Sequence, residues 1–206
     1  LTEKGSINIM LDKMEGQQEL EYENEARFNH LHAIGKHIED TLREKIGSDL
    51  IQVDNPMRTE GNTIVEDVQN GQDIVVRIKN GEEWVDIFYV EVKSKWDFSE
   101  PAHMSTRQVR MAALHPNEYA LCCVDLRKHK HEDLENLPTE IILECTNVKM
   151  GIGEILNPML KAILEADNRS DDEQIKISEY RSNMGASIFE KGDSLDVLLN
   201  TIETKI

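Results

Sequence analysis

The chain has 206 residues, of which 23 are Lys or Arg and 40 are Asp or Glu, so its formal net charge is −17. This length suits one domain with a substantial core, and the negative charge argues against a protein that coats nucleic acid. No apolar run approaches the roughly 18 residues of a membrane span, and no secretory signal is recognisable. We therefore expect an intracellular, cytoplasmic protein that makes no contact with a membrane.

The first quarter of the sequence predicts a long amphipathic helix, from about residue 10 to residue 46. Apolar residues such as Ile34, Ile38 and Leu42 recur at spacings of four, which is typical of a helix with one buried stripe. Gly35 lies inside this helix, where glycine costs about 1 kcal/mol relative to alanine, so we expect close packing there. Gly47 and the serine after it are expected to end the helix, and residues 49–53 to form a short strand.

Two strands and a turn are predicted next. Residues 72–79 and 83–95 have strand character, and Asn80 followed by glycine is a turn signal. Alternate residues of a strand share one face of the sheet. Glu91 and Lys93 are therefore expected to point the same way, which gathers ionisable groups on one face.

Whether Asp73 joins that face depends on the register of the hairpin. A two-residue turn at Asn80 and Gly81 would place Asp73 on the face opposite Glu91. A five-residue loop, or a β-bulge, would instead place Asp73 directly across from Glu91. A shared site for the two carboxylates thus predicts a longer loop or a bulge.

The rest of the chain predicts further helices and strands. After a loop that starts at residue 96, Ser105 is expected to cap a helix that runs to about Leu114, and an apolar strand follows at residues 118–126. The final third predicts a strand at 140–145, a helix at 152–166, a strand or irregular segment at 175–189 and a last helix at 194–205.

Positive charge gathers around the second predicted strand. Between Lys93 and Lys130, seven Lys and Arg residues stand against four acidic residues, a local charge of +3 in a chain of charge −17. The remainder of the chain therefore carries a charge of −20. A basic island of this kind is compatible with a phosphate-bearing substrate at one face of the protein.

The order of these elements resembles the PD-(D/E)XK nuclease superfamily, in particular its Mrr-like branch and the C-terminal domain of protein NO VEIN. The matching stretches are IGKHIEDTLREKI (34–46), GQDIVVRI (71–78), YVEVKSK (89–95) and SxxQVRMAxxxxxEYALCCVDL (105–126). Gln72 departs from the pattern, because a proline usually stands before the acidic residue of the motif.

The resemblance implies an α/β fold of the restriction-endonuclease type, with a mixed central sheet flanked by helices and a C-terminal extension of helix and strand. We expect a helical leader at residues 1–30, a nuclease-like core at 31–135, and the extension packed on the core at 136–206.

The resemblance also implies a metal-dependent active site. Asp73 and Glu91 would hold Mg²⁺ or Mn²⁺ together with the backbone carbonyl of Val92, and paired carboxylates suit such hard ions. Lys93 would orient or deprotonate the attacking water and stabilise developing charge.

Five further residues are expected to support this site. Glu39, on the first helix, would be an outer-sphere or second-metal ligand, and Gln108 resembles the glutamine that some members of the superfamily place beside the lysine. The three expected contacts with nucleic acid are Lys95, Arg107 and Arg110.

The expected function is metal-dependent hydrolysis of phosphodiester bonds, in DNA rather than RNA, by an endonuclease domain at the C-terminus of a larger defence or DNA-processing protein. The resemblance implies a homodimer and cooperation with other domains of that longer chain. Two alternatives stay open. One is a catalytically silent nuclease-fold domain that recognises nucleic acid or protein, and the other is an ordinary α/β domain whose charged residues form structural ion pairs.

Overall fold

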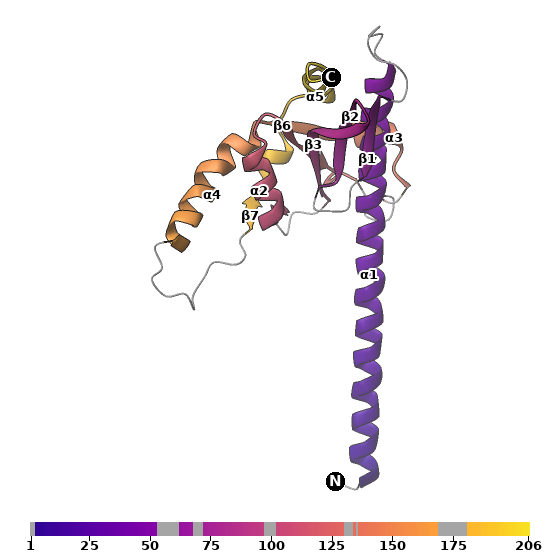
Figure 1. The fold of residues 1–206 in the computed structure, drawn as a ribbon. Coiled ribbons are helices and arrows are strands. Elements are labelled where there is room, and N and C mark those ends of the chain that lie inside the picture. Colours follow the sequence, from indigo (N-terminus) through magenta and orange to yellow (C-terminus); the bar gives the residue numbers. More distant parts are fainter. Residues whose placement is uncertain are drawn as a thin grey trace. The chain divides into compact units, whose positions relative to one another are not determined.

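The computed structural model of the chain describes residues 3–52, 62–67, 72–96, 102–129, 134, 136–168 and 181–206 (Figure 1). The chain divides into two compact units, Leu1–His37 and Ile38–Ile206. The second unit contains every strand of the described residues and all the predicted site residues. Among the described residues, no helix combines the length and apolar character that crossing a membrane requires.

Helix α1 runs from Glu3 to Gln52 and includes the acidic segment that precedes the apolar stripe. The predicted end at Gly47 and the predicted strand at residues 49–53 are therefore wrong as far as residue 52, and residue 53 lies outside the described residues. The helix continues because Leu50 extends the stripe by one turn beyond Ile46, and both side chains are fully buried. An ion pair between Lys45 and Asp49 spans the same turn, at 2.7 Å between Nζ and Oδ2.

Gly35 does not mark close packing. A Cβ atom added at this position would meet no neighbouring atom within 4 Å. The expectation drawn from its helical position is therefore wrong, and glycine is not required there by any contact.

The central sheet has five strands in the order β1-β2-β3-β5-β6. Their bounds are Thr63–Asp67 for β1, Ile74–Asn80 for β2, Glu83–Lys95 for β3, Tyr119–Asp125 for β5 and Thr146–Met150 for β6. Strands β3 and β5 are parallel, whereas the other neighbours are antiparallel. The expected mixed sheet is confirmed, and the C-terminal part of the chain supplies its last strand.

A second, two-stranded sheet joins distant parts of the sequence. Strand β4 (Ala102–Met104) lies in a stretch predicted as loop, and it pairs antiparallel with β7 (Ser182–Met184) from the C-terminal part. Met104 and Met184 are buried in the core cluster. The small sheet is therefore anchored through one of its faces.

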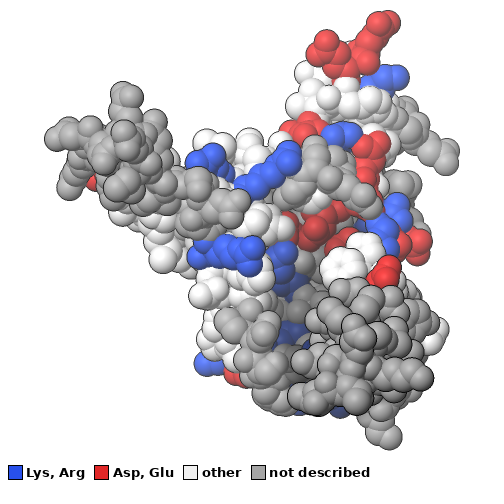
Figure 2. Space-filling view, turned by 90° about the horizontal axis from the view of Figure 1, so that it is seen from below, with Lys and Arg blue, Asp and Glu red and all other residues white. Residues whose placement is uncertain are grey.

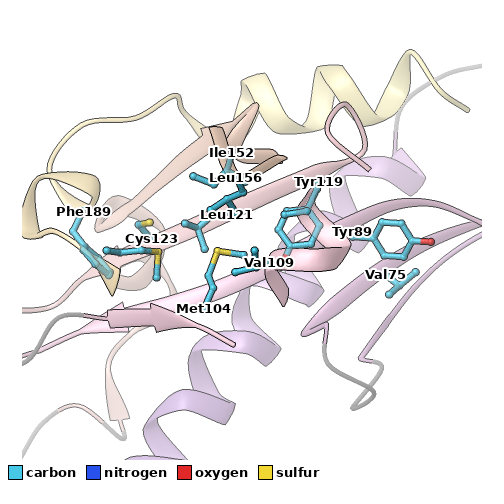
Figure 3. Packing of buried hydrophobic residues seen from close by; sticks show 12 residues of the cluster. Val75, Tyr89, Met104, Val109, Tyr119, Leu121, Cys123, Ile152, Leu156 and Phe189 are labelled. Carbon is cyan, nitrogen blue, oxygen red and sulfur yellow. The ribbon is translucent and has the colours of Figure 1, made fainter. Parts of the chain in front are cut away.

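Helices α2 (Thr106–Leu114) and α4 (Ile152–Asn168) cover one face of the central sheet, and both were predicted. Figure 3 shows side chains of these helices, of the sheet and of the 3-10 turn Ala186–Phe189 meeting in one apolar cluster. The two helices approach closely at Gly153, where a Cβ atom would lie 1.9 Å from the carbonyl oxygen of Ala112. The expected flanking of the sheet by helices is thereby confirmed.

After residue 136, helix α3 and strand β6 differ from the prediction, and the last helix follows it. Of the segment predicted at 175–189, residues 175–180 lie outside the described residues. Residues Thr139–Glu144 form helix α3 instead of a strand, and β6 follows at once. The helical period explains the error, because Ile142 is buried while Glu140 and Glu144, four residues apart, are exposed. The last predicted helix is confirmed as α5 (Leu195–Glu203).

Candidate active site

The β2–β3 hairpin contains both a tight turn and a bulge. Asn80 pairs with Glu83, so the loop consists of Gly81 and Glu82, and Gly81 has the positive φ of 64° that favours glycine at this position. Further along, Arg77 pairs with Asp86 but Val76 pairs with Phe88. One extra residue, Ile87, is therefore inserted on β3.

The bulge brings Asp73 and Glu91 together. Beyond it, Ile74 pairs with Val90, so the next opposed residues are Asp73 and Glu91. If the same residues paired regularly, without a bulge, Asp73 would oppose Val90 and face the other side of the sheet from Glu91. We predicted that the two carboxylates could share a face only with a longer loop or a bulge. This prediction is confirmed, because the hairpin has a bulge.

The carboxylate of Asp73 is held by the backbone of β3. Its Oδ2 accepts a hydrogen bond from the backbone N–H of Val92, at 2.7 Å. Asp73 directly precedes β2. Its negative charge near Glu91 raises the pKa of the Glu91 carboxyl. This hydrogen bond therefore holds two carboxylates near each other.

Glu91 is the centre of the arrangement, with an exposed fraction of 0%. Its Oε1 forms an ion pair with Nζ of Lys93 and accepts a hydrogen bond from Nε2 of Gln108. On the other side, the hydroxyl of Tyr119 lies 3.5 Å from Oε2. Burial of a carboxylate is costly unless such partners surround it.

Gln108 reaches Glu91 because of the way helix α2 begins. Ser105 is the N-cap, and its Oγ accepts a hydrogen bond from the backbone N–H of Gln108. In return, Oε1 of Gln108 accepts a hydrogen bond from the backbone N–H of Ser105, at 2.8 Å. This reciprocal capping box fixes the amide, so that its NH₂ group is directed at the carboxylate.

The electrostatic environment favours protonation of Glu91 when no cation is bound. Burial raises the pKa of Glu91, the nearby Asp73 raises it further, Lys93 opposes the change, and the result is a pKa of about 8. Burial, followed by the negative charges of Glu91 and Asp73, also raises the pKa of Tyr119. A divalent cation would relieve this unfavourable charge, and the two carboxylates are the hard oxygen donors that Mg²⁺ prefers.

The structure brings together four of the predicted site residues, namely Asp73, Glu91, Lys93 and Gln108, with the backbone of Val92. Glu39 lies half buried on α1. Within the described part of the chain, no three His, Cys, Asp or Glu side chains form a group that could hold a metal ion. The structure therefore shows a pair of carboxylates, and the role of Glu39 stays a prediction.

The three predicted contacts with nucleic acid differ in exposure. Arg107 and Arg110 are exposed on α2, whereas Lys95 is only 7% exposed at the end of β3. A buried ammonium group does not suit a contact with a polymer at the surface. Figure 2 shows Lys and Arg side chains in the middle of one face of the molecule, with Asp and Glu side chains beside them.

Tyr119 is the residue near the site that the sequence analysis missed. The strand that carries it was predicted, but its hydroxyl was not assigned a partner. The sequence contained the information needed to assign it. A tyrosine at the start of an apolar strand is expected to be buried, and its O–H then needs a hydrogen-bond acceptor.

Comparisons with known proteins give a family model that matches part of the chain and a solved structure of low similarity. A family model described as "Protein NO VEIN, C-terminal" matches residues 50–135. A solved nuclease from a fusselovirus aligns with a TM-score of 0.36 and 14% identity, over 66% of this chain and 68% of that one. A search of curated proteins gave no match. The resemblance to the C-terminal domain of protein NO VEIN is thus confirmed for residues 50–135, the stretch that carries Asp73, Glu91, Lys93 and Gln108.

Proposed function

We propose that the chain is a metal-dependent nuclease that hydrolyses phosphodiester bonds, with DNA as the preferred substrate. The observation that supports this proposal best is the fully buried Glu91 carboxylate, opposed to Asp73 and contacted by Lys93 and Gln108. An ordinary structural ion pair needs neither a second carboxylate at its side nor a bulge that brings it there.

In this proposal each side chain has a separate task. Asp73, Glu91 and the carbonyl of Val92 would hold Mg²⁺ or Mn²⁺, which would polarise the phosphate and make a bound water more acidic. Lys93, placed by its contact with Glu91, stabilises negative charge that develops on the phosphate and orients the attacking water. Gln108 fixes the orientation of the Glu91 carboxylate.

The reaction is a simple hydrolysis. The oxygen of water forms a bond to phosphorus, the bond from phosphorus to the leaving oxygen breaks, and one proton of the water ends on that leaving oxygen. Lys93, two residues after Glu91 on the same strand, is proposed to transfer or hold the proton.

The test is incubation of the full chain with plasmid, single-stranded DNA and RNA, with and without Mn²⁺ or Mg²⁺. Cleavage is expected only with metal, and Lys93→Ala and Asp73→Ala should each reduce it by at least about 100-fold. Lys79→Ala is the matched control, because this lysine is exposed near the end of β2. Undiminished cutting by either site variant, with circular dichroism that shows an intact fold, would refute the assignment.

A second candidate function is recognition without catalysis. It is favoured by the net charge of −17, which opposes tight binding of a free polyanion by the isolated chain. Calorimetry separates the two candidates. If neither Mg²⁺ nor Mn²⁺ binds the intact chain, the recognition domain is favoured, whereas binding that is lost in Asp73→Ala favours the nuclease.

A further inference from the structure

The two-stranded sheet of β4 and β7 has one anchored face and one exposed face. Met104 and Met184 point into the core, and in a strand the next residue points the opposite way. His103 and Asn183 are opposed in the register, and both are exposed. The outer face of this small sheet is therefore polar.

The same register extends the outer face by one pair. Met104 pairs with Ser182, so Ser105 and Arg181 come next, and both are exposed. Nη1 of Arg181 lies 3.4 Å from Nε2 of His103. Because a guanidinium group can only donate, the ring nitrogen of His103 accepts, and Arg181 lies along the outer face.

This outer face adjoins the candidate active site. Ser105 is the N-cap that holds Gln108, and Gln108 contacts Glu91. Opposed residues of an antiparallel pair are about 5 Å apart, which puts the backbone of Arg181 next to that cap. Arg181 is thus linked to the candidate site through Ser105 and Gln108.

Two exposed arginines lie near this face. Arg107, in the first turn of α2, is exposed like Arg181. Across the part of the chain that the structure describes, neither arginine forms an ion pair with a carboxylate. Arg107 follows Ser105 by two residues, and Arg181 precedes the residue that pairs with Met104. Arginine is suited to phosphate oxygens because it can bind them through two parallel hydrogen bonds.

We propose that His103, Arg107, Arg181 and Asn183, called here the β4–β7 face, bind the phosphodiester backbone of a nucleic acid beside the candidate active site. The inference rests on the proposed nuclease function and specifies how the polymer is held. It assigns a role in binding to Arg181 and Asn183, which lie beyond the stretch 50–135 that matches the family model. The phosphate contact is independent of base sequence.

The test is fluorescence anisotropy with the full chain and labelled 20-nucleotide probes: single-stranded DNA, duplex DNA and RNA. EDTA is present so that no metal-dependent cleavage occurs. Salt is varied from 50 to 300 mM. If Arg181 neutralises one phosphate of the duplex, Arg181→Ala should reduce the slope of log K against log salt by about 0.9 and weaken binding by about 8-fold at 0.1 M salt. Comparison of the three probes identifies which polymer carries the phosphates.

Three matched variants make the result specific. Arg181→Lys keeps the charge and should retain the salt slope, although it loses the paired hydrogen bonds. Arg107→Ala should behave like Arg181→Ala, and it replaces that variant if the latter has a lower melting temperature than the wild type. Arg27→Ala removes an exposed arginine of α1 and should leave both quantities unchanged.

The outcomes separate this inference from the proposed function. Three results would refute phosphate binding by the β4–β7 face. They are an unchanged affinity and salt slope in folded Arg181→Ala and Arg107→Ala, an equal loss of affinity in Arg27→Ala, and no binding of any probe. Plasmid cleavage with Mn²⁺ is measured in parallel on the wild type. If binding depends on Arg181 but no probe or plasmid is cleaved, the nuclease proposal is refuted and binding by the β4–β7 face is supported. If the wild type cleaves plasmid and Arg181→Ala binds the probes as tightly as the wild type, only binding by the β4–β7 face is refuted.

Discussion

Metal binding at Glu91 should depend steeply on pH. The neighbourhood of this carboxyl raises its pKa from 4.5 to about 8, and a carboxyl group must lose its proton before it can bind a metal ion. With a pKa near 8, the group is about 1% ionised at pH 6 and about half ionised at pH 8, so the apparent affinity for Mn²⁺ should rise by about 50-fold over this range. The titratable groups that surround it are Asp73, Lys93 and Tyr119.

The assay is isothermal titration calorimetry with Mn²⁺ at pH 6, 7 and 8, in two buffers that differ in their enthalpy of ionisation. Close to one proton should be released for each ion bound at pH 6, and about half a proton at pH 8. Glu91→Gln should abolish both binding and proton release. Glu83→Gln, at the exposed start of the same strand, is the matched control. Equal affinity at pH 6 and pH 8 would refute the reasoning.

The same shift predicts how the metal-free protein responds to pH. The pKa of Glu91 is higher in the folded chain than its ordinary value of 4.5, so the folded state binds the proton more tightly than the unfolded state. This contribution to stability is complete below pH 4.5 and is lost as the pH rises through 8, with a magnitude of roughly 5 kcal/mol. Thermal unfolding in EDTA should show a melting temperature that falls from pH 6 to pH 9, and Glu91→Gln should flatten this dependence. A melting temperature of the wild type that rises over the same range would contradict the shift.

Three further changes have expected results. Gly153→Ala should destabilise the fold by about 1–3 kcal/mol in chemical denaturation, because its Cβ would overlap the backbone of α2. Gly35→Ala, the control in open space, should be neutral or stabilising by up to about 1 kcal/mol, and equal losses in the two variants would contradict the packing argument. Deletion of Ile87 should retain metal-stimulated cleavage, because without the bulged residue the hairpin is regular and Asp73 still opposes Glu91, with Ile87→Val as the control, and loss of cleavage in a deletion variant that keeps the circular dichroism of the sheet would disprove the register. Ser105→Ala should lower stability by about 1 kcal/mol through loss of the N-cap, and an unchanged melting temperature would show that the cap is dispensable.

The hairpin and helix α2 could be predicted because their signals are local. The alternation on β3 placed Glu91 and Lys93 on one face, and the spacing from Ser105 to Gln108 is that of a capping box. Periodicity and capping depend on neighbours in the sequence. These elements also carry the candidate site, which is why most of its residues could be named before the structure was known.

Other elements could not be assigned from local signals. The apolar run at Ile141 to Leu143 is too short to separate a helix from a strand, and only the tertiary burial of Ile142 decides it. Strand β1 lies in a polar stretch, where pairing with β2 outweighs a weak propensity. Strand β7 is three residues long and exists through its pairing with β4, about eighty residues earlier in the chain. Such long-range pairing leaves little trace in a single sequence.

The bulge at Ile87 gives the number of residues between the two carboxylates a functional meaning. Seventeen residues separate Asp73 from Glu91, and an odd number cannot be accommodated by a regular hairpin with a two-residue turn when the flanking residues are directly opposed. If the bulge and the turn were kept, loss of one codon within this interval would leave every acidic and basic side chain in the sequence and yet place the two carboxylates on opposite sides of the sheet. In a relative with the same turn, an odd interval needs one bulge and an even interval needs none, so the count of intervening residues predicts whether a bulge is required for the two carboxylates to meet.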